Sequence, residues 1–168
     1  MLYKIFNAPS PTTGSMVPVT TGTSLKTLLQ IKPGTTRTLK LREWGISFDG
    51  STAATPGIVT ASVTDTAATV TAHVAAGIHK YDAEAISAGD PTTAIIAVGT
   101  TSTGYTASNE GTVGTNRICD SHLIAPTNQL IYQFPLGVSF LIQPSEFFRI
   151  RVTFGTAINA LCYAIVEA

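Results

Sequence analysis

The sequence predicts an all-β protein, an antiparallel β-sandwich, and three observations support this fold class. Thr makes up about one residue in six, and with Val and Ile it favours the pleated, half-buried surface of a sheet over helix. Turn signals recur at "KPGT", "TPG", "AGDPTT" and "PLG" and separate short apolar runs, as in sandwiches and barrels. With 44% hydrophobic and 12% charged residues, the 168-residue chain is expected to form one compact domain.

Strands are placed where apolar residues form short runs or alternate with polar ones. They are expected at residues 25–32, 37–48, 57–64, 69–74, 94–98, 116–124, 129–134, 147–154 and 158–166. Together they assign residues 24–168 to a single sandwich domain.

Residues 1–23 are expected to form an extended N-terminal arm. Pro9, Pro11, Gly14 and Pro18 forbid a continuous helix and interrupt any long central strand. The arm also carries apolar side chains, which gain little by lying in water, and we expect contacts from Leu2, Tyr3, Ile5 and Phe6. Its own sandwich, a neighbouring subunit and a larger shell are all open as the surface on which it packs.

The stretch "TLKLREWGISFDG", Thr38 to Gly50, changes its apolar face part-way along. Leu39 and Leu41 are odd-numbered, whereas Trp44, Ile46 and Phe48 are even-numbered. Since successive strand side chains face opposite sides, one extra residue must be absorbed between the two sets. A β-bulge at Arg42 and Glu43 would do this, and this architectural interpretation is favoured over one in which the two charges face a ligand.

Two segments between strands are less regular. Residues 76–90, "AGIHKYDAEAISAGD", have rough helical spacing and Gly89 as a stop signal, so a helical turn or two is an even alternative to loop there. Residues 99–116 are rich in Gly, Ser and Thr and are expected to form an exposed excursion anchored by Tyr105.

The last two strands differ in how many faces they bury. In "FFRIRVTF", apolar residues at even positions from 148 to 154 alternate with Arg149, Arg151 and Thr153. This alternation predicts one buried face and one half-exposed charged face. In residues 158–166 both faces are apolar, since Leu161, Tyr163 and Ile165 lie opposite Ile158, Cys162 and Val166. We therefore expect Leu161, Tyr163 and Ile165 to form the interface of a closed homo-oligomer.

Charge and hydropathy restrict the partners. Ten basic and ten acidic residues give a formal net charge of +0, and so no long-range field to hold nucleic acid. No apolar run is long enough to span a bilayer or to act as a cleaved signal, so neither membrane insertion nor export is expected. With a mean hydropathy of +0.27, the surface is expected to contact other protein.

No catalytic signature emerges from the possible active groups. "CDSH", Cys119 to His122, offers two soft metal ligands, but zinc needs three or four and no second close pair exists. Asp120, Ser121 and His122 have the residue types of a triad, yet Ser121 and His122 face opposite sides of a strand. Among the acids, Glu43, Asp49, Glu84 and Asp90 are candidates for a glycosidase pair, although chance pairing is expected among ten. We therefore expect no enzyme activity, no metal and no cofactor.

Histidine and cysteine leave two smaller questions. His73 and His79 lie in "HVAAGIHKYDAEA", where a pH-responsive or partner-binding loop is the alternative to a solvated one. Cys119 and Cys162 both lie in apolar surroundings, which favours free buried thiols over a disulfide.

Three blocks of the chain resemble small structural proteins of tailed-bacteriophage and prophage particles. They are "TTGTSLKTLLQIKPGTTRTLKLREWGISFDG", then "TVTAHVAAGIHKYDAEA" with "TSTGYTASNEGT", and finally "FFRIRVTF" with "INALCYAIVEA". The resemblance implies a jelly-roll-like sandwich that decorates or cements the head shell, usually as a homotrimer bound to the major capsid protein. It would place the protein on the virion after synthesis in the host cytoplasm. It supplies no lattice-binding motif that transfers residue by residue.

The alternative function is a carbohydrate-binding β-sandwich module, which needs exposed aromatic platforms for sugar rings. Trp44 is expected to lie on a buried strand face, which leaves Tyr3, Tyr81, Tyr105 and Tyr132 as weaker candidates.

Overall fold

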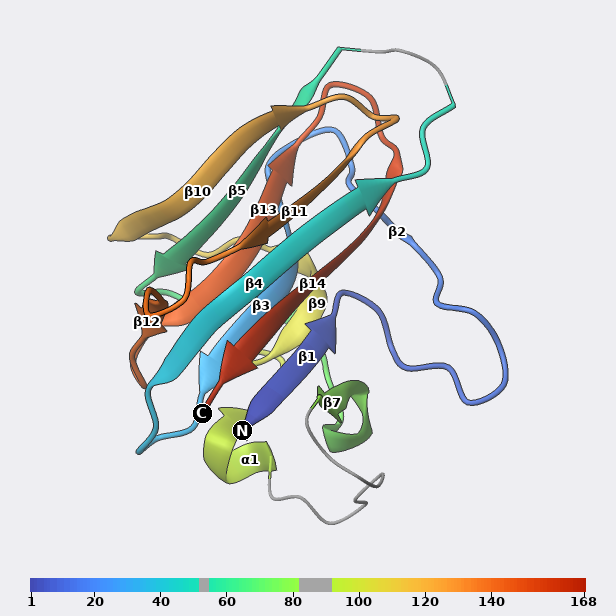
Figure 1. The fold of residues 1–168 in the computed structure, drawn as a ribbon. Helices are drawn as coiled ribbons and strands as arrows, with labels where there is room; N and C mark the ends of the chain where they lie inside the picture. Colours follow the sequence, from blue (N-terminus) through green and yellow to red (C-terminus); the bar gives the residue numbers. More distant parts are fainter. Residues whose placement is uncertain (52–54, 82–91) are drawn as a thin grey trace.

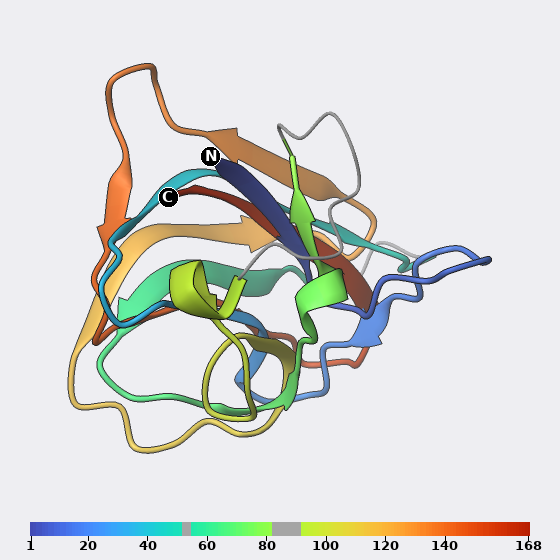
Figure 2. The same ribbon diagram turned by 90° about the horizontal axis from the view of Figure 1, so that it is seen from below.

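The computed structural model describes residues 1–51, 55–81 and 92–168, which form two antiparallel β-sheets packed face to face (Figure 1). The front sheet has the order β11-β4-β14-β1-β7, with β12 and β2 pairing to β4 and β14. The back sheet has the order β10-β5-β13-β3-β9-β6, with β8 pairing to β3. Seen from below, the two sheets form separate layers (Figure 2). The predicted all-β sandwich is confirmed.

The strand bounds follow the expected pattern, with five additional strands. The expected strands are β3 (Lys26–Pro33), β4 (Leu39–Phe48), β5 (Gly57–Thr64), β6 (Thr69–Ala72), β8 (Ile96–Ala97), β10 (Asn116–Ile124), β11 (Gln129–Gln133), β13 (Phe147–Thr153) and β14 (Asn159–Glu167). The additional strands are β1 (Leu2–Phe6), β2 (Val19–Thr20), β7 (Ile78–Lys80), β9 (Gly104–Asn109) and β12 (Phe140–Ile142).

The pairing of these strands is that of a jelly roll. Strands β3, β4, β5 and β6 pair in turn with β13, β11, β10 and β9, so each successive pair is nested inside the previous one. Such nesting arises when one long antiparallel hairpin is wound around a common core. The innermost pair departs from the ordinary arrangement, because β9 joins the back sheet beside β3. Strands β14 and β1 complete the front sheet.

The core lies between the inner faces of the two sheets. Its largest members are Trp44, Tyr3, Phe148 and Phe154, and each is at most 2% exposed. Alternate residues of β13 enter this core, as the sequence predicts, because side chains of a strand point to opposite faces in turn. At about 25 cal/mol per Å² of buried apolar surface, such side chains supply most of the stabilisation.

The predicted bulge in β4 is confirmed by its register with β14. Ile165 lies opposite Glu43 and Val166 lies opposite Leu41, so the strand register between β4 and β14 skips Arg42. This extra residue lets Leu41 and Trp44 both face the core, where each is 0% exposed. The bulge therefore resolves the change of apolar face along the strand.

The N-terminal residues belong to the front sheet. Strand β1 lies between β14 and β7, and Tyr3 and Ile5 are 0% exposed in the core. Further on, β2 pairs with the start of β14. Residues 2–6 of the expected arm thus pack on their own sandwich, one of the three surfaces left open by the sequence.

The region in which helix and loop are even alternatives is only partly described. Residues Ala75–Gly77 form a single 3-10 turn, β7 follows directly, and residues 82–91 lie outside the described part of the chain. A short helix, α1 (Thr92–Ile95), occupies the start of the strand expected at 94–98. No helix of the described residues is long and apolar enough to cross a membrane.

The segment at 99–116 is more regular than expected. Its central part is β9, which pairs with both β3 and β6 and so belongs to the back sheet. The Tyr105 ring packs against the His73 ring in a tilted arrangement with centroids 4.9 Å apart, in agreement with its expected anchoring role. Gly104 permits the close approach of β9 to β6, because a Cβ at position 104 would lie 2.3 Å from the Thr71 carbonyl oxygen.

Candidate functional site

The three residues expected at an oligomer interface lie on the outer face of β14. Strand β14 is flanked by β4 and β1, so this face is the middle of the front sheet (Figure 1). Ile165 is only 6% exposed, and Leu161 and Tyr163 are half-buried. The chain itself therefore covers much of the apolar surface that we expected a neighbouring subunit to cover.

Tyr163 is held by contacts from both neighbouring strands. Its hydroxyl donates a hydrogen bond of 2.5 Å to Glu43 Oε1 on β4. The Lys4 ammonium of β1 lies 4.0 Å from the ring centroid, which is a cation–π contact. Burial and the adjacent Glu43 carboxylate raise the pKa of the Tyr163 phenol, which stays protonated and able to donate at neutral pH.

The four residues expected to make arm contacts divide between the two faces of β1. Tyr3 and Ile5 enter the core, whereas Leu2 and Phe6 belong to the opposite face. The centroid of the Phe6 ring lies 6.0 Å from that of the Tyr163 ring and 5.9 Å from that of the His79 ring. All four side chains thus belong to this surface or to the core beneath it.

An open hollow of about 900 Å³ lies on the front sheet beside these residues. It is lined by Leu2 and Ile165, by the charged residues Arg42, Glu43 and Glu167, and by the loop that begins at Phe134. Each lining carboxylate has a partner: Glu43 accepts from Tyr163 and Gln133, and Glu167 forms an ion pair with Arg42. The Arg42 hydrogen bond lowers the pKa of Glu167. These contacts join strands to one another and leave a mixed apolar and polar concave surface.

Asp120, Ser121 and His122 do not have the geometry of a triad. Asp120 Oδ1 lies 2.7 Å from His122 Nε2, but Ser121 Oγ is 3.0 Å from Thr60 Oγ1, on the other side of the strand. The expected separation of Ser121 from His122 is therefore confirmed. No group of three or more metal-ligating side chains occurs in the part of the chain that the structure describes.

Among the described residues, the other two candidate carboxylates, Glu43 and Asp49, each have separate partners. Asp49 accepts the Asn159 side-chain amide at 2.9 Å, and this hydrogen bond lowers the pKa of Asp49. Glu43 lies in the hollow described above. Glu84 and Asp90 fall outside the described residues.

His73 and His79 contact the end of β1 and the chain that follows it. His73 is 3% exposed, and its Nε2 lies 2.7 Å from the Phe6 carbonyl oxygen. Burial lowers the pKa of His73, so the ring is neutral at pH 7 and Nε2 carries the donated proton. His79 Nε2 lies 2.6 Å from Ser10 Oγ. The contacts of both histidines are structural, and His73 is a group that responds to acid.

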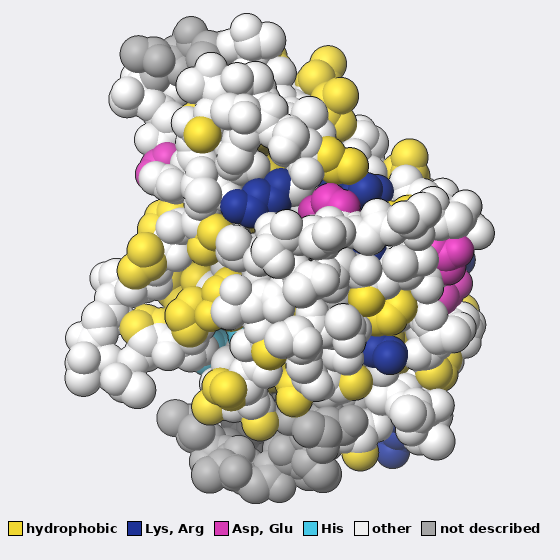
Figure 3. Space-filling model, turned by 180° about the vertical axis from the view of Figure 1, so that it is seen from behind, with side chains coloured by type: hydrophobic (Ala, Val, Ile, Leu, Met, Phe, Trp, Pro, Cys, Tyr) yellow, Lys and Arg dark blue, Asp and Glu magenta, His cyan; other side chains and the backbone are white. Residues whose placement is uncertain are grey.

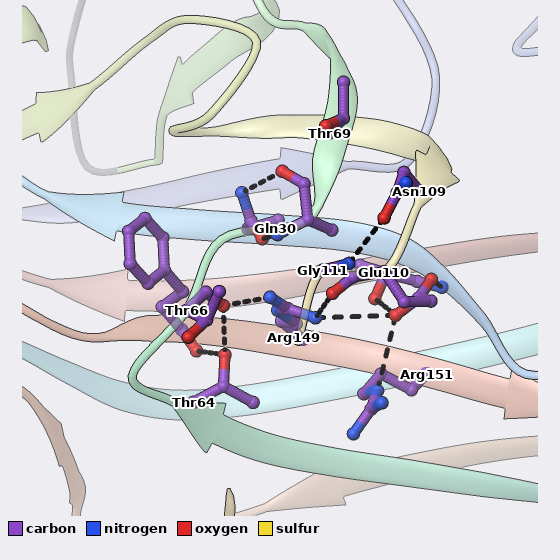
Figure 4. Close-up of polar contacts among 12 residues, drawn as sticks. Gln30, Thr64, Thr66, Thr69, Asn109, Glu110, Gly111, Arg149 and Arg151 are labelled. Atoms are coloured by element: carbon purple, nitrogen blue, oxygen red, sulfur yellow. Dashed lines mark hydrogen bonds and ion pairs between the residues drawn. The ribbon is translucent and has the colours of Figure 1, made fainter. Parts of the chain in front are cut away.

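A buried charged cluster on the back sheet was not foreseen (Figure 4). Arg149 is 0% exposed, so the expectation that it lies on a half-exposed face is wrong. Segments around Thr66 and Glu110 fold over the outer face of β13 and supply its partners. Arg149 Nη1 donates to the Glu110 carbonyl at 3.1 Å and lies 3.4 Å from the carboxylate, while Nη2 donates to the Thr66 carbonyl.

Glu110 is the centre of this cluster. Its carboxylate accepts the Thr27 backbone N–H at 2.5 Å and the Thr27 hydroxyl at 2.7 Å, and lies 3.6 Å from Arg151 Nε. Burial lowers the pKa of Arg149 to about 10, which leaves the guanidinium charged at neutral pH. No sequence signal could have found this cluster, because Glu110 lies in a Gly-rich segment 39 residues from Arg149.

The two cysteines are free thiols, which agrees with the favoured interpretation. Cys162 is fully buried in the core, and burial raises the pKa of Cys119 to about 12. Both therefore stay as protonated, unreactive thiols at neutral pH.

Exposed apolar side chains are frequent in one part of the described chain. Within residues 118–141 these are Ile118, Leu123, Ile131, Tyr132, Leu136, Val138 and Leu141. They belong to β10, β11, β12 and the loops between them, and β10 and β11 each lie at one end of their sheets. The back face of the molecule carries few charged side chains among uncharged and hydrophobic ones (Figure 3).

Comparisons with protein-family models, curated proteins and solved structures gave no match.

Proposed function

We propose that this chain is a structural virion protein that decorates or cements the head shell of a tailed bacteriophage. The observation that carries the proposal is the combination of a jelly-roll-paired sandwich with a weakly charged surface that exposes several large apolar side chains in β10, β11, β12 and the loops between them. Large exposed apolar patches on soluble proteins mark surfaces that meet other molecules. The three blocks that resemble phage particle proteins give this surface its expected partner, the major capsid protein.

The physical demands of the role suit such a molecule. A shell presents the same surface many times, so modest contacts add up through avidity, without one tight site. A cement protein that associates with its own copies adds further contacts, and the resemblance implies a trimer. Weak charge limits salt dependence, since screening acts on exposed ion pairs far more than on apolar contacts.

The experiment uses assembled heads of the phage or prophage whose genome encodes this chain. The purified chain is mixed with these heads, and the heads are then sedimented. We expect the chain to sediment with heads and to raise the temperature at which they release DNA. A matched variant, Leu123→Asp, replaces a side chain that is 72% exposed and should weaken this binding without unfolding the sandwich. A chain that stays in the supernatant at all concentrations would overturn the proposal.

The alternative, a carbohydrate-binding module, gains no support from the aromatic residues. Trp44 is 0% exposed, as the sequence predicts, and cannot serve as a sugar platform. Tyr81 and Tyr132 are exposed, at 58% and 36%, but lie on opposite edge strands of the front sheet or beside them. A glycan array scored with the chain and its Tyr132→Ala variant tests this function directly.

A further inference from the structure

Strand β11 is a free edge of the front sheet. It pairs with β4 from Gln129 to Gln133 without a break in register, and no other described strand pairs with its outer side. All its residues except Leu130 are exposed, including Ile131 at 60%. The backbone N–H and C=O groups on its outer side are thus available to pair with another strand.

The edge lacks the protection that natural edge strands carry. Lys, Pro, bulges and very short lengths normally prevent edge-to-edge pairing. In this molecule β10 has a register shift at Cys119 together with Arg117 and Asp120, while β7 is a three-residue strand with His79 and Lys80. By contrast, β11 has neither a charge nor a bulge, and no Asp, Glu, Lys or Arg occurs anywhere from residue 123 to residue 145.

The sequence of β11 is self-complementary. It is "QLIYQ", so the same residue classes occur in both directions from its centre. Two antiparallel copies centred on Ile131 would place Ile131 opposite Ile131, Gln129 opposite Gln133, and Leu130 opposite Tyr132. Amide pairs and aromatic–aliphatic pairs are both favourable across strands, and each forms twice because the contact is symmetric.

We infer that β11 pairs with β11 of a second copy of this chain, antiparallel about a twofold axis at Ile131. The expected partner strand is β11 of a second copy, because an identical strand matches the self-complementary sequence at every position. An uncharged edge strand also has no side chain that could form an ion pair with a charged partner. Pairing joins the two front sheets into one continuous sheet and removes the exposed edge. The inference goes beyond the particle role and does not depend on it, and its twofold contact is an alternative to the trimer implied by resemblance.

The contact is small, and this sets the expected affinity. Five residue pairs bury less than the roughly 1,200 Å² of a standard stable interface. We therefore expect a dimer that dissociates on dilution, with Kd on the order of micromolar. On a shell, where copies are held close together, such a contact would be populated far more than in dilute solution.

Sedimentation-velocity centrifugation of the full chain over a wide concentration range is the first test. We expect a monomer–dimer equilibrium, and we expect Ile131→Lys, which puts two ammonium groups opposite each other at the axis, to remain monomeric. The matched control is Leu136→Lys, which changes a fully exposed side chain of the same uncharged stretch without altering β11 and should leave the dimer intact. A monomeric or trimeric wild-type chain, or equal loss of dimer in both variants, would overturn the inference.

Cross-linking gives a second readout that does not require Ile131→Lys to fold. Residues facing each other in an antiparallel pair have Cα atoms about 4.5–5.5 Å apart, within the range of a disulfide. We expect Ile131→Cys to form a covalent dimer under mild oxidation and Leu136→Cys to form far less. If Ile131→Cys gives no more cross-linked dimer than Leu136→Cys, the inference is wrong. Head binding is measured separately, so a monomer that binds heads overturns only this inference, and a dimer that ignores heads overturns only the proposed function.

Discussion

Tyr163 and Gly45 face each other across β14 and β4, and a Cβ at position 45 would lie 2.7 Å from Tyr163 Cε1. The absence of a side chain at Gly45 is therefore what lets the aromatic ring lie flat against the sheet. In that position the ring receives Lys4 on β1 and its hydroxyl reaches Glu43 on β4. One glycine thus permits the contacts that join three strands on this face.

Gly45→Ala should destabilise the fold by about 1–2 kcal/mol, since the added methyl group pushes the ring away and lengthens its hydrogen bond to Glu43. Urea unfolding followed by far-UV circular dichroism measures this. Gly155→Ala is the matched control, because a Cβ there meets nothing within 4 Å, and it should change stability by less than about 0.5 kcal/mol. Equal effects of the two substitutions would show that Tyr163 adapts freely.

Glu110→Gln should cost about 3 kcal/mol, because it keeps the shape of the side chain but removes the nearest counter-charge of the buried Arg149 guanidinium. The control is Glu146→Gln in the ion pair with Arg117, whose side chain is 48% exposed, and we expect a loss below about 1 kcal/mol. Both are measured by urea unfolding at pH 7. If the two losses are the same, the cluster under residues 109–111 contributes no more than a surface ion pair.

Structural features that depend only on neighbouring residues could be predicted from the sequence, and features that depend on distant segments could not. The bulge at Arg42 was predictable, because the change of face between Leu41 and Trp44 is recorded within a few residues and admits few solutions. The burial of Arg149 was not predictable, because it depends on a segment that approaches only in the folded chain. Alternation within β13 correctly separates its two faces but does not say what covers the outer one.

The N-terminal strand illustrates the same limit. Pro9, Pro11 and Pro18 correctly exclude a long central strand through residues 9–18, but β1 ends at Phe6, before the first of them. Apolar side chains on both faces of residues 2–6 are equally consistent with an arm on another subunit and with a strand inside the sandwich. Only the pairing with β14 and β7 distinguishes these alternatives.

Acid should weaken the fold through His73. Its pKa is lowered by burial in the folded protein, so the unfolded chain binds more protons and stability falls as pH drops through the ordinary histidine value of about 6.5. The charged ring would also face His79, which lowers its pKa further. We expect the free energy of unfolding to decline between pH 7.5 and 5.5 in the wild-type chain, and to decline less in His73→Gln.

Gly155→Ala is the control for this pH dependence, because it changes no titratable group and a Cβ there meets nothing within 4 Å. It should leave the slope of stability against pH close to that of the wild-type chain. A slope that His73→Gln does not change would mean that other groups bind the protons.

Ile5→Ala should destabilise the sandwich by about 2–5 kcal/mol, because it opens a cavity beneath a strand that is paired on both sides. Ile5 is 0% exposed, whereas Val17, in the segment between β1 and β2, is 71% exposed. Val17→Ala is therefore the control and should cost less than about 0.5 kcal/mol. Thermal unfolding of both variants separates an N-terminal strand that belongs to the core from an arm that only contacts neighbours. If Ile5→Ala were as stable as the wild-type chain in dilute solution yet lost self-association or head binding, residues 2–6 would act as an arm after all.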